Sequence, residues 1–175
     1  MLGPEGSGSA STKPPHASVI SVVVKEIIVV CYGNICRSPI GEVLLQRTLD
    51  DRLGEGRVLV TSAGIGADDG RPPSQGTVRS MQARGFDVRR LRSTYLTPHL
   101  ARRAWRIYCM EDYQVRRVRE LLADDGDKVM LLDGEEVPDP LGSSQDAYDA
   151  VAMQIERLLP QVVADIEGAL AAEDS

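Results

Sequence analysis

The chain has 175 residues, enough for one domain with a layered core and too few for two, and its 42% hydrophobic and 26% charged residues exclude wholesale disorder. A net charge of −6 gives no overall attraction to nucleic acid or anionic lipid, so we expect neither as a partner. No apolar run reaches membrane-spanning length, and residues 1–18 lack the basic start and apolar centre of a secretion signal, so we expect a cytoplasmic protein.

The amino-terminal residues differ in composition from the rest of the chain. Residues 1–17 are rich in Gly, Ser and Pro and have almost nothing to bury, which predicts a flexible tail before a single domain over residues 18–175. The apolar residues 18–24 fit either an extension of the first strand or an extra edge strand.

Short apolar runs alternate along the domain with longer stretches of helical periodicity. This alternation predicts an α/β fold, in which a four-stranded parallel sheet carries helices on both faces. The predicted strands are KEIIVVCY, RVLVTS, RIYCM and KVMLL, and the predicted helices cover residues 38–53, 73–86, 111–124 and 144–170.

The last of these helices is the best defined. Apolar residues recur along it every three or four positions, which predicts one face packed against the core. Pro160 lies within the pattern and is expected to kink or restart the helix, because proline lacks the backbone donor. The apolar stripe consists of Tyr148, Val151, Ala152, Ile155, Leu158, Leu159, Val162, Val163 and Ile166.

The stretch VVCYGNICRSPI, residues 29–40, lies where the first predicted strand passes into the first predicted helix. Ligands of parallel sheets bind at the carboxyl ends of strands, and this loop suits an anion. Gly33 allows a tight turn, the loop amides can point inward, and the helix that begins near Ser38 and Pro39 adds its positive end. Arg37 can hold two phosphate oxygens with its planar guanidinium. The sequence therefore predicts a phosphate loop after the first strand.

Cys31 opens this loop, and amide dipoles, a helix N-terminus and a guanidinium all favour its thiolate form. We therefore interpret Cys31 as a nucleophile aimed into the phosphate cradle. Ser38 is a natural N-cap, but its hydroxyl could instead donate to the Cys31 sulfur. Asn34 is expected to hold the shape of the loop through side-chain hydrogen bonds to the backbone. The three cysteines, completed by Cys36 and Cys109, have neither the number nor the spacing of a disulfide framework or a zinc site.

The stretch CYGNICRSP, residues 31–39, resembles the signature loop of the low-molecular-weight protein tyrosine phosphatases, which has the pattern C-x5-R-S. The resemblance continues through TSAG at residues 61–64, the strand that ends in CM at residues 109–110, and PDP at residues 138–140. It thus covers residues 25–163, close to the whole predicted domain. The resemblance implies hydrolysis of phosphotyrosine in proteins through a phosphocysteine intermediate.

A thiolate that attacks phosphorus must expel an alkoxide or phenoxide, which leaves more easily when a carboxylic acid protonates it. Asp139 is the candidate, because it lies between two prolines just after the last predicted strand, at the same edge of the sheet. The resemblance makes Asp139 this acid, and then the base that activates water, beside Cys31 and Arg37. It implies a phosphorylated protein as substrate and no metal or organic cofactor. The remaining loop residues are expected to bind the substrate: Tyr32, Gly33, Asn34, Ile35, Cys36 and Ser38.

Two markers in the sequence disagree about the substrate. Leu141 and Gly142 stand where many tyrosine phosphatases of this family have aromatic residues, and the segment looks more like the protein arginine phosphatase branch. Ile35 favours phosphotyrosine, because the arginine branch has threonine there and an isoleucine side chain cannot hydrogen-bond a phosphoguanidinium. We expect a tyrosine phosphatase, with an arginine phosphatase as the alternative.

Four further residues bear on the loop. Gly41, where family members carry Ala, predicts a looser first helical turn, and Arg84 replaces a histidine that supports the loop in many relatives. Tyr32 is either an aromatic wall at the pocket entrance or a packed strand end. Cys36 is either a small buried filler or, as in the family, the partner of a reversible disulfide with the nucleophile.

Two other classes of protein fit parts of this sequence, namely thiol-linked arsenate reductases and phosphate-binding modules without activity. Thiol-linked arsenate reductases share the fold and loop, but they use resolving cysteines in a mobile segment, whereas the only later cysteine here is Cys109 in a predicted strand. A silent phosphate-binding module would have lost the nucleophile, the arginine or the acid, and all three are present. The sequence does not indicate an oligomeric state.

Overall fold

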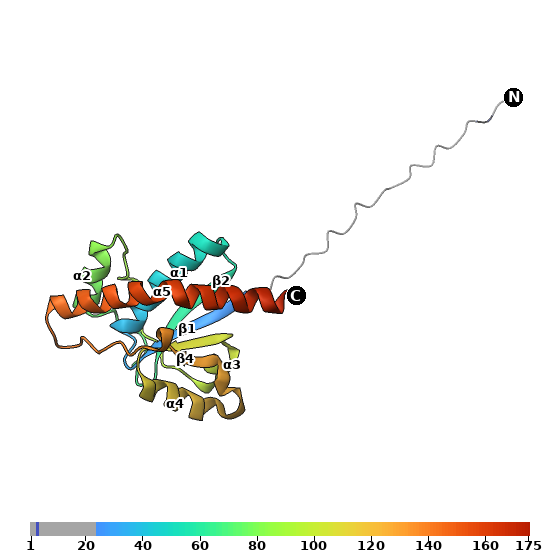
Figure 1. The fold of residues 1–175 in the computed structure, drawn as a ribbon. Helices are drawn as coiled ribbons and strands as arrows, with labels where there is room; N and C mark the ends of the chain where they lie inside the picture. The colour runs from blue at the N-terminus through green and yellow to red at the C-terminus, as the bar shows by residue number, and fades with distance from the viewer. Residues whose placement is uncertain (1–2, 4–23) are drawn as a thin grey trace.

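The structure, a computed structural model, describes Gly3 and residues 24–175 (Figure 1). The predicted flexible tail and the undecided segment 18–24 therefore lie outside the described residues, apart from Gly3 and Val24.

The described residues form a four-stranded parallel sheet with the strand order β2-β1-β3-β4. After the central strand β1 the chain adds β2 on one side, and it then crosses to add β3 and β4 on the other. The loop after β1 therefore lies at the point where the strand order reverses, which is where open α/β sheets bind ligands. The strands are β1 (Lys25–Cys31), β2 (Val58–Gly64), β3 (Arg106–Cys109) and β4 (Val129–Leu131).

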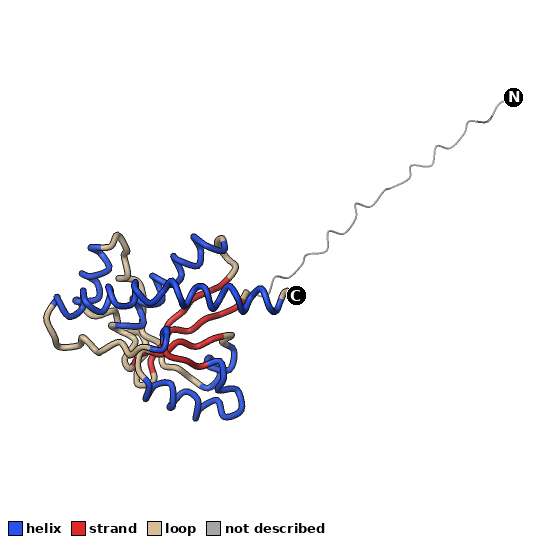
Figure 2. Tube along the Cα trace, viewed as in Figure 1, coloured by secondary structure: helices blue, strands red, loops and turns tan. Residues whose placement is uncertain are grey.

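Within residues 24–175, five α-helices cover both faces of the sheet, which confirms the predicted fold class. Helices α1, α2 and α5 lie on one side and α3 and α4 on the other, with the strands between them (Figures 1 and 2). None of the described helices is long and apolar enough to cross a membrane. The helices are α1 (Arg37–Leu53), α2 (Gln75–Ala83), α3 (Pro98–Arg103), α4 (Asp112–Leu122) and α5 (Gln145–Glu173), and two short 3-10 segments are η1 (Ala123–Lys128) and η2 (Leu132–Gly134).

Strand β1 is buried on both faces, which explains why its sequence is a continuous apolar run. Ile27 and Val29 belong to the larger core under α1 and α5, whereas Ile28 and Val30 belong to the smaller core under α3 and α4. Its carboxyl end is held rigidly between two neighbouring strands.

All four predicted strands and all four predicted helices are present, with ends shifted by a few residues. Helix α3 was not predicted, because six residues are too few to show periodicity; its signals are the Thr97 cap and Pro98. The predicted stripe on α5 is confirmed, since its nine residues are the buried residues of that helix. Helix α5 runs through Pro160 as a single element, so the predicted restart does not occur.

Gly41 sets the distance between α1 and the sheet. A Cβ atom at this position would lie 2.8 Å from Val29 Cγ1 and 3.0 Å from Met110 Cε, closer than side chains normally approach. The glycine thus lets α1 pack more closely on β1 than alanine would, whereas the expectation of a looser first turn stays a prediction.

Candidate active site

The predicted phosphate loop forms at the carboxyl end of β1. Cys31 is the last residue of the strand and Arg37 is the first residue of α1, and both side chains reach one hollow of about 290 Å³. We call it the loop hollow. Its walls also include Tyr32, Gly33, Ile35, Cys36, Gly66, Asp68, Arg71, Asp139 and Leu141.

Arg37 is only 1% exposed and is held from behind by two acceptors. Its Nη1 donates to Glu111 Oε2 over 2.6 Å and to the Val137 carbonyl over 2.9 Å. Its Nη2 lies 3.5 Å from Asp139 Oδ2, while its buried Nε finds no acceptor among the described residues. Burial by itself would lower the pKa of Arg37, but the hydrogen bond to Glu111 and the charges of Cys31, Asp139 and Glu111 together raise it. The site therefore holds a fixed positive charge with a free donor, which suits an anion.

The Cys31 sulfur lies 3.0 Å from Ser38 Oγ, which is the contact that donation from this hydroxyl to the sulfur requires, and either atom can be the donor. The N-cap interpretation is wrong: α1 begins at Arg37, so Ser38 lies inside the first turn and the capping position is Cys36. Ser38 is fully buried, and its hydroxyl has a second acceptor in the Ala63 carbonyl, 3.5 Å away.

Asn34 anchors the loop to its neighbours. Its Nδ2 donates to Ser38 Oγ over 2.8 Å and to Ser62 Oγ over 2.9 Å, and its Oδ1 accepts from the Thr94 amide over 2.8 Å. The predicted bond to the backbone is therefore present, together with two bonds to hydroxyls. Ser62 in turn donates to Glu42, whose carboxyl has a pKa raised by burial although the bond from Ser62 opposes the shift. A chain of hydrogen bonds thus runs from Glu42 to the hydroxyl beside the Cys31 sulfur.

The tight turn of the loop is made by Asn34 and not by Gly33, contrary to the prediction. Asn34 has a φ of +53°, in the left-handed region that asparagine tolerates, whereas the φ of Gly33 is not positive. A Cβ atom at Gly33 would lie 3.7 Å from Ile35 Cγ1, an ordinary contact. Glycine at this position is therefore not required by the backbone.

Asp139 lies at the mouth of the loop hollow, as its position after the last strand predicted. Its side chain is 44% exposed, with Oδ2 toward Arg37 and Oδ1 accepting from the Leu141 amide over 3.1 Å. The structure therefore brings a carboxyl, a buried guanidinium and the Cys31 sulfur to one small volume, although Cys31 and Asp139 are far apart in the chain.

Aromatic and apolar side chains line part of the hollow, beside the charged Asp68 and Arg71. Tyr32 is 54% exposed, and its ring lies across Gly66, where a Cβ atom would be 2.5 Å from the Tyr32 Cζ. Of the two roles considered for Tyr32, the structure places it at the entrance and not in the core. Ile35 lines the hollow from within the loop, and Leu141 is an exposed residue of its lining.

The back of the loop is held by residues that the sequence analysis did not single out. The Ser74 amide donates to the Ile35 carbonyl over 2.8 Å, and the Cys36 sulfur lies 3.3 Å from Ser74 Oγ and 3.8 Å from the Tyr148 hydroxyl. Burial raises the pKa of Cys36, and the hydrogen bonds with Ser74 and Tyr148 only partly oppose it. Arg84 is paired with a carboxylate of α5 and is not part of this support. All three cysteines are free thiols, so a redox partnership of Cys36 stays a prediction.

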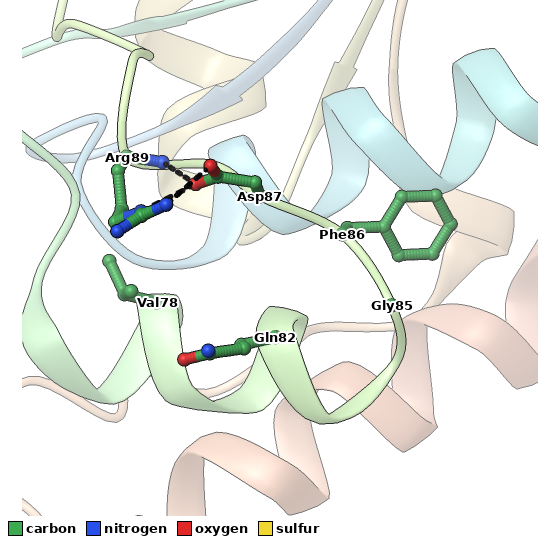
Figure 3. Close-up of a pocket in the computed structure, with 6 residues that line it drawn as sticks. All are labelled: Val78, Gln82, Gly85, Phe86, Asp87 and Arg89. Carbon is green, nitrogen blue, oxygen red and sulfur yellow. Dashed lines mark hydrogen bonds and ion pairs between the residues drawn. The ribbon is translucent and has the colours of Figure 1, made fainter.

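A second hollow and the distribution of metal-ligating side chains among the described residues offer no competing site. A hollow of about 230 Å³ lies between α2 and the segment that follows it, where Asp87 and Arg89 bind each other (Figure 3). It contains no nucleophile. Within the described range, no group of three or more His, Cys, Asp or Glu side chains could hold a metal ion.

Comparison with known proteins identifies similar chains. Residues 26–172 match the family model described as low molecular weight phosphotyrosine protein phosphatase. The probable low molecular weight protein-tyrosine-phosphatase EpsP of Ralstonia solanacearum is 37% identical over 136 residues, which cover 75% of this chain and 89% of EpsP. Vibrio vulnificus Wzb in complex with benzylphosphonate is 28% identical, with a TM-score of 0.73 over 81% of this chain and 99% of Wzb. The YwlE arginine phosphatase from Geobacillus stearothermophilus is 24% identical, with a TM-score of 0.75 over 85% of this chain and 96% of YwlE, and shares the fold.

Proposed function

The chain belongs to the low molecular weight phosphotyrosine protein phosphatase family and is a protein tyrosine phosphatase, and we propose that it works through a phosphocysteine intermediate formed on Cys31. The observation that carries this proposal is the loop hollow, in which the Cys31 sulfur, the buried Arg37 guanidinium and the Asp139 carboxyl converge. These are a nucleophile, an anion clamp and a proton donor, the three groups that hydrolysis of a phosphate ester needs.

The reaction proceeds in two steps. In the first, the Cys31 sulfur bonds to phosphorus while the bond from phosphorus to the tyrosine oxygen breaks, and Asp139 gives its proton to that oxygen. Arg37 and the loop amides hold the other phosphate oxygens as charge develops on them. In the second, Asp139 takes a proton from a water whose oxygen bonds to phosphorus, and the sulfur–phosphorus bond breaks. The hydroxyl of Ser38, 3.0 Å from the sulfur, stabilises the departing thiolate.

Ile35 favours phosphotyrosine over phosphoarginine. Its side chain lies in the loop, only 9% exposed, and offers apolar contact to an aromatic ring and no hydrogen bond to a guanidinium. Overall similarity does not separate the two substrates, because a YwlE arginine phosphatase structure is 28% identical, the same identity as the Vibrio vulnificus Wzb structure. Matched phosphotyrosine and phosphoarginine peptides would compare the two, and a higher kcat/KM on phosphoarginine would reverse this assignment.

The burial of Cys109 argues against the arsenate reductase alternative. Cys109 is fully buried in β3, within the core under α3 and α4, and burial raises its pKa far above the usual range for a thiol. A thiol in that state is a poor resolving nucleophile.

Replacement of the nucleophile tests the proposal. Cys31→Ser is expected to abolish turnover of aryl phosphates while binding of inorganic phosphate or vanadate persists, because the loop and Arg37 survive without the sulfur. Cys109→Ala serves as the matched control, since it removes a thiol that does not line the loop hollow. Substantial turnover by Cys31→Ser would exclude the covalent mechanism.

A further inference from the structure

Three hollows follow one another along the surface, starting at the catalytic loop. The loop hollow shares Tyr32 and Gly66 with a second hollow of about 490 Å³, which lies beside the first half of α4. The second hollow shares Ile65, Arg117 and Glu120 with a third, of about 310 Å³, which continues along the same helix. We call the second and third hollows together the α4 groove. Its walls are formed chiefly by Ile65, Gly66, Tyr95, Tyr113, Arg116 and Arg117.

The α4 groove is lined by aromatic side chains that project into solvent. Tyr32 is 54% exposed, Tyr95 46% and Tyr113 40%, so three of the five tyrosines of the chain stand along one path that starts at the active site. Exposed tyrosines of this kind are enriched where proteins bind other chains, because they offer a large rigid surface with a polar end.

The charge of the groove differs from that of the whole molecule. Two arginines and one glutamate line it, whereas the chain carries a net charge of −6. Arg117 is 74% exposed and its ion pair with Glu120 measures 3.8 Å; Arg116 is 64% exposed and pairs with Asp112. Exposed pairs of this kind contribute little to stability, so both guanidinium groups can exchange to a carboxylate of a ligand.

We propose, on the basis of the function proposed above, that the α4 groove binds the segment beside the phosphotyrosine of the protein substrate and selects for acidic side chains in that segment. A phosphotyrosine whose phosphate lies in the loop leaves the hollow past Tyr32. The Tyr32 ring packs on the Cα of Gly66, which has no side chain to keep it away, and so forms a wall common to both sites. An extended segment that follows this path reaches Arg116 and Arg117 on α4.

The preference is tested with two phosphotyrosine peptides that differ only in their flanking residues, which are Glu in one and Gln in the other. Wild type is expected to show a kcat/KM roughly 5–10-fold higher on the Glu peptide, mainly through KM, since one or two exposed ion pairs are worth about 1 kcal/mol. The double variant Arg116→Gln, Arg117→Gln should reduce this ratio to about 1–2-fold. Added salt should reduce the ratio for wild type in the same direction.

The matched control removes the same charge elsewhere. Arg47 on α1 and Arg102 at the end of α3 are both exposed and line neither the loop hollow nor the α4 groove. The double variant Arg47→Gln, Arg102→Gln should keep the wild-type ratio. An equal loss of preference in both double variants would overturn the proposal, because overall charge alone would then explain it.

Reversal of the charge at Arg117 should give the enzyme a new preference for basic peptides. Arg117→Glu is expected to prefer a peptide with Lys in the flanking positions over the Glu peptide, the reverse of wild type. The affinities of the same peptides for Cys31→Ser measure binding in the groove without turnover. The rate of hydrolysis of an aryl phosphate, which has no flanking residues, measures the activity of the loop without the groove. Equal affinities for the Glu and Gln peptides would overturn this inference even if the aryl phosphate is hydrolysed, whereas failure on the aryl phosphate would count against the proposed function alone.

Discussion

Two of the hollows in the described part of the chain are compared by their arginines: in each, an arginine lies beside an aspartate, but the two arginines are used in different ways. Arg89 is exposed, and its Nε and Nη2 each donate to Asp87 over 2.8 Å, with the Arg89 amide adding a third bond (Figure 3). Arg37 is buried, is fixed from behind by Glu111 and a carbonyl, and keeps its Nε donor free of the described acceptors.

This difference separates a simple ion pair from a binding site: the question is whether the donors of the arginine are already occupied. The donors of Arg89 are occupied by a carboxylate two residues away, so a ligand would have to displace a local and well-aligned partner. Arg37 is immobilised through its Nη1 and also lines the loop hollow. The free energy needed to bury its charge is offset within the folded protein, before any ligand binds. An arginine arranged in this way can bind an anion without reorganising.

The largest effect is expected at the two arginines themselves. Arg37→Lys should lower kcat/KM on aryl phosphates by roughly 10³–10⁵-fold, because a point charge cannot replace a guanidinium that holds two phosphate oxygens. Arg89→Lys, the matched change in the other hollow, should stay within about 2-fold. Wild-type activity in Arg37→Lys would remove the distinction between the two sites.

The second effect concerns the aspartates. Asp139→Asn should lower the rate by roughly 10²–10⁴-fold on substrates with poor leaving groups and much less on activated aryl phosphates, which leave without a proton. The pH–rate profile should lose the limb that reports the acid. We would measure kcat/KM over aryl phosphates of graded leaving-group pKa, and a plot for Asp139→Asn no steeper than for wild type would show that another group is the acid.

The smallest effect is expected from Asp87→Asn, which should leave the kinetics unchanged and lower the melting temperature by less than about 3 °C, since exposed pairs contribute little. The hydrogen bond from Arg89 lowers the pKa of Asp87. Because a lowered pKa gives stability above the ordinary value for aspartate that is lost as pH falls toward the folded value, the difference between wild type and variant should shrink in acid. A difference that grows in acid would contradict this assignment.

The sheet and the phosphate loop were predictable because their signals are local. The buried strands are continuous apolar runs, and Cys31 and Arg37 lie within one contiguous motif. Two wrong predictions came from residue type: glycine suggested the tight turn that Asn34 makes, and Pro160 suggested a restart in a helix that runs through it, with buried residues before and after the proline.

The supports of the site were not predictable from one sequence. Glu111, Ser74 and Tyr148 reach the loop from three different elements, and nothing in their neighbourhoods shows where the fold will bring them. For Glu111 a signal existed, since a carboxylate directly after a buried strand lies at the same sheet edge as the loop. The distance of α1 from the sheet at Gly41 likewise depends on which side chains face it.

The contacts that hold Arg37 in place also fix when the enzyme can become active during folding. Its partners are separated from it by 74 residues at Glu111 and by 100 at Val137, and Tyr148 meets Cys36 across 112. During synthesis the nucleophile therefore emerges long before the carboxylate and the helix that complete its surroundings. Contacts of such long range form late and slow folding, so activity should return in refolding only together with the docking of α5 on the core. A chain interrupted before the final third would carry the signature motif but have no catalyst.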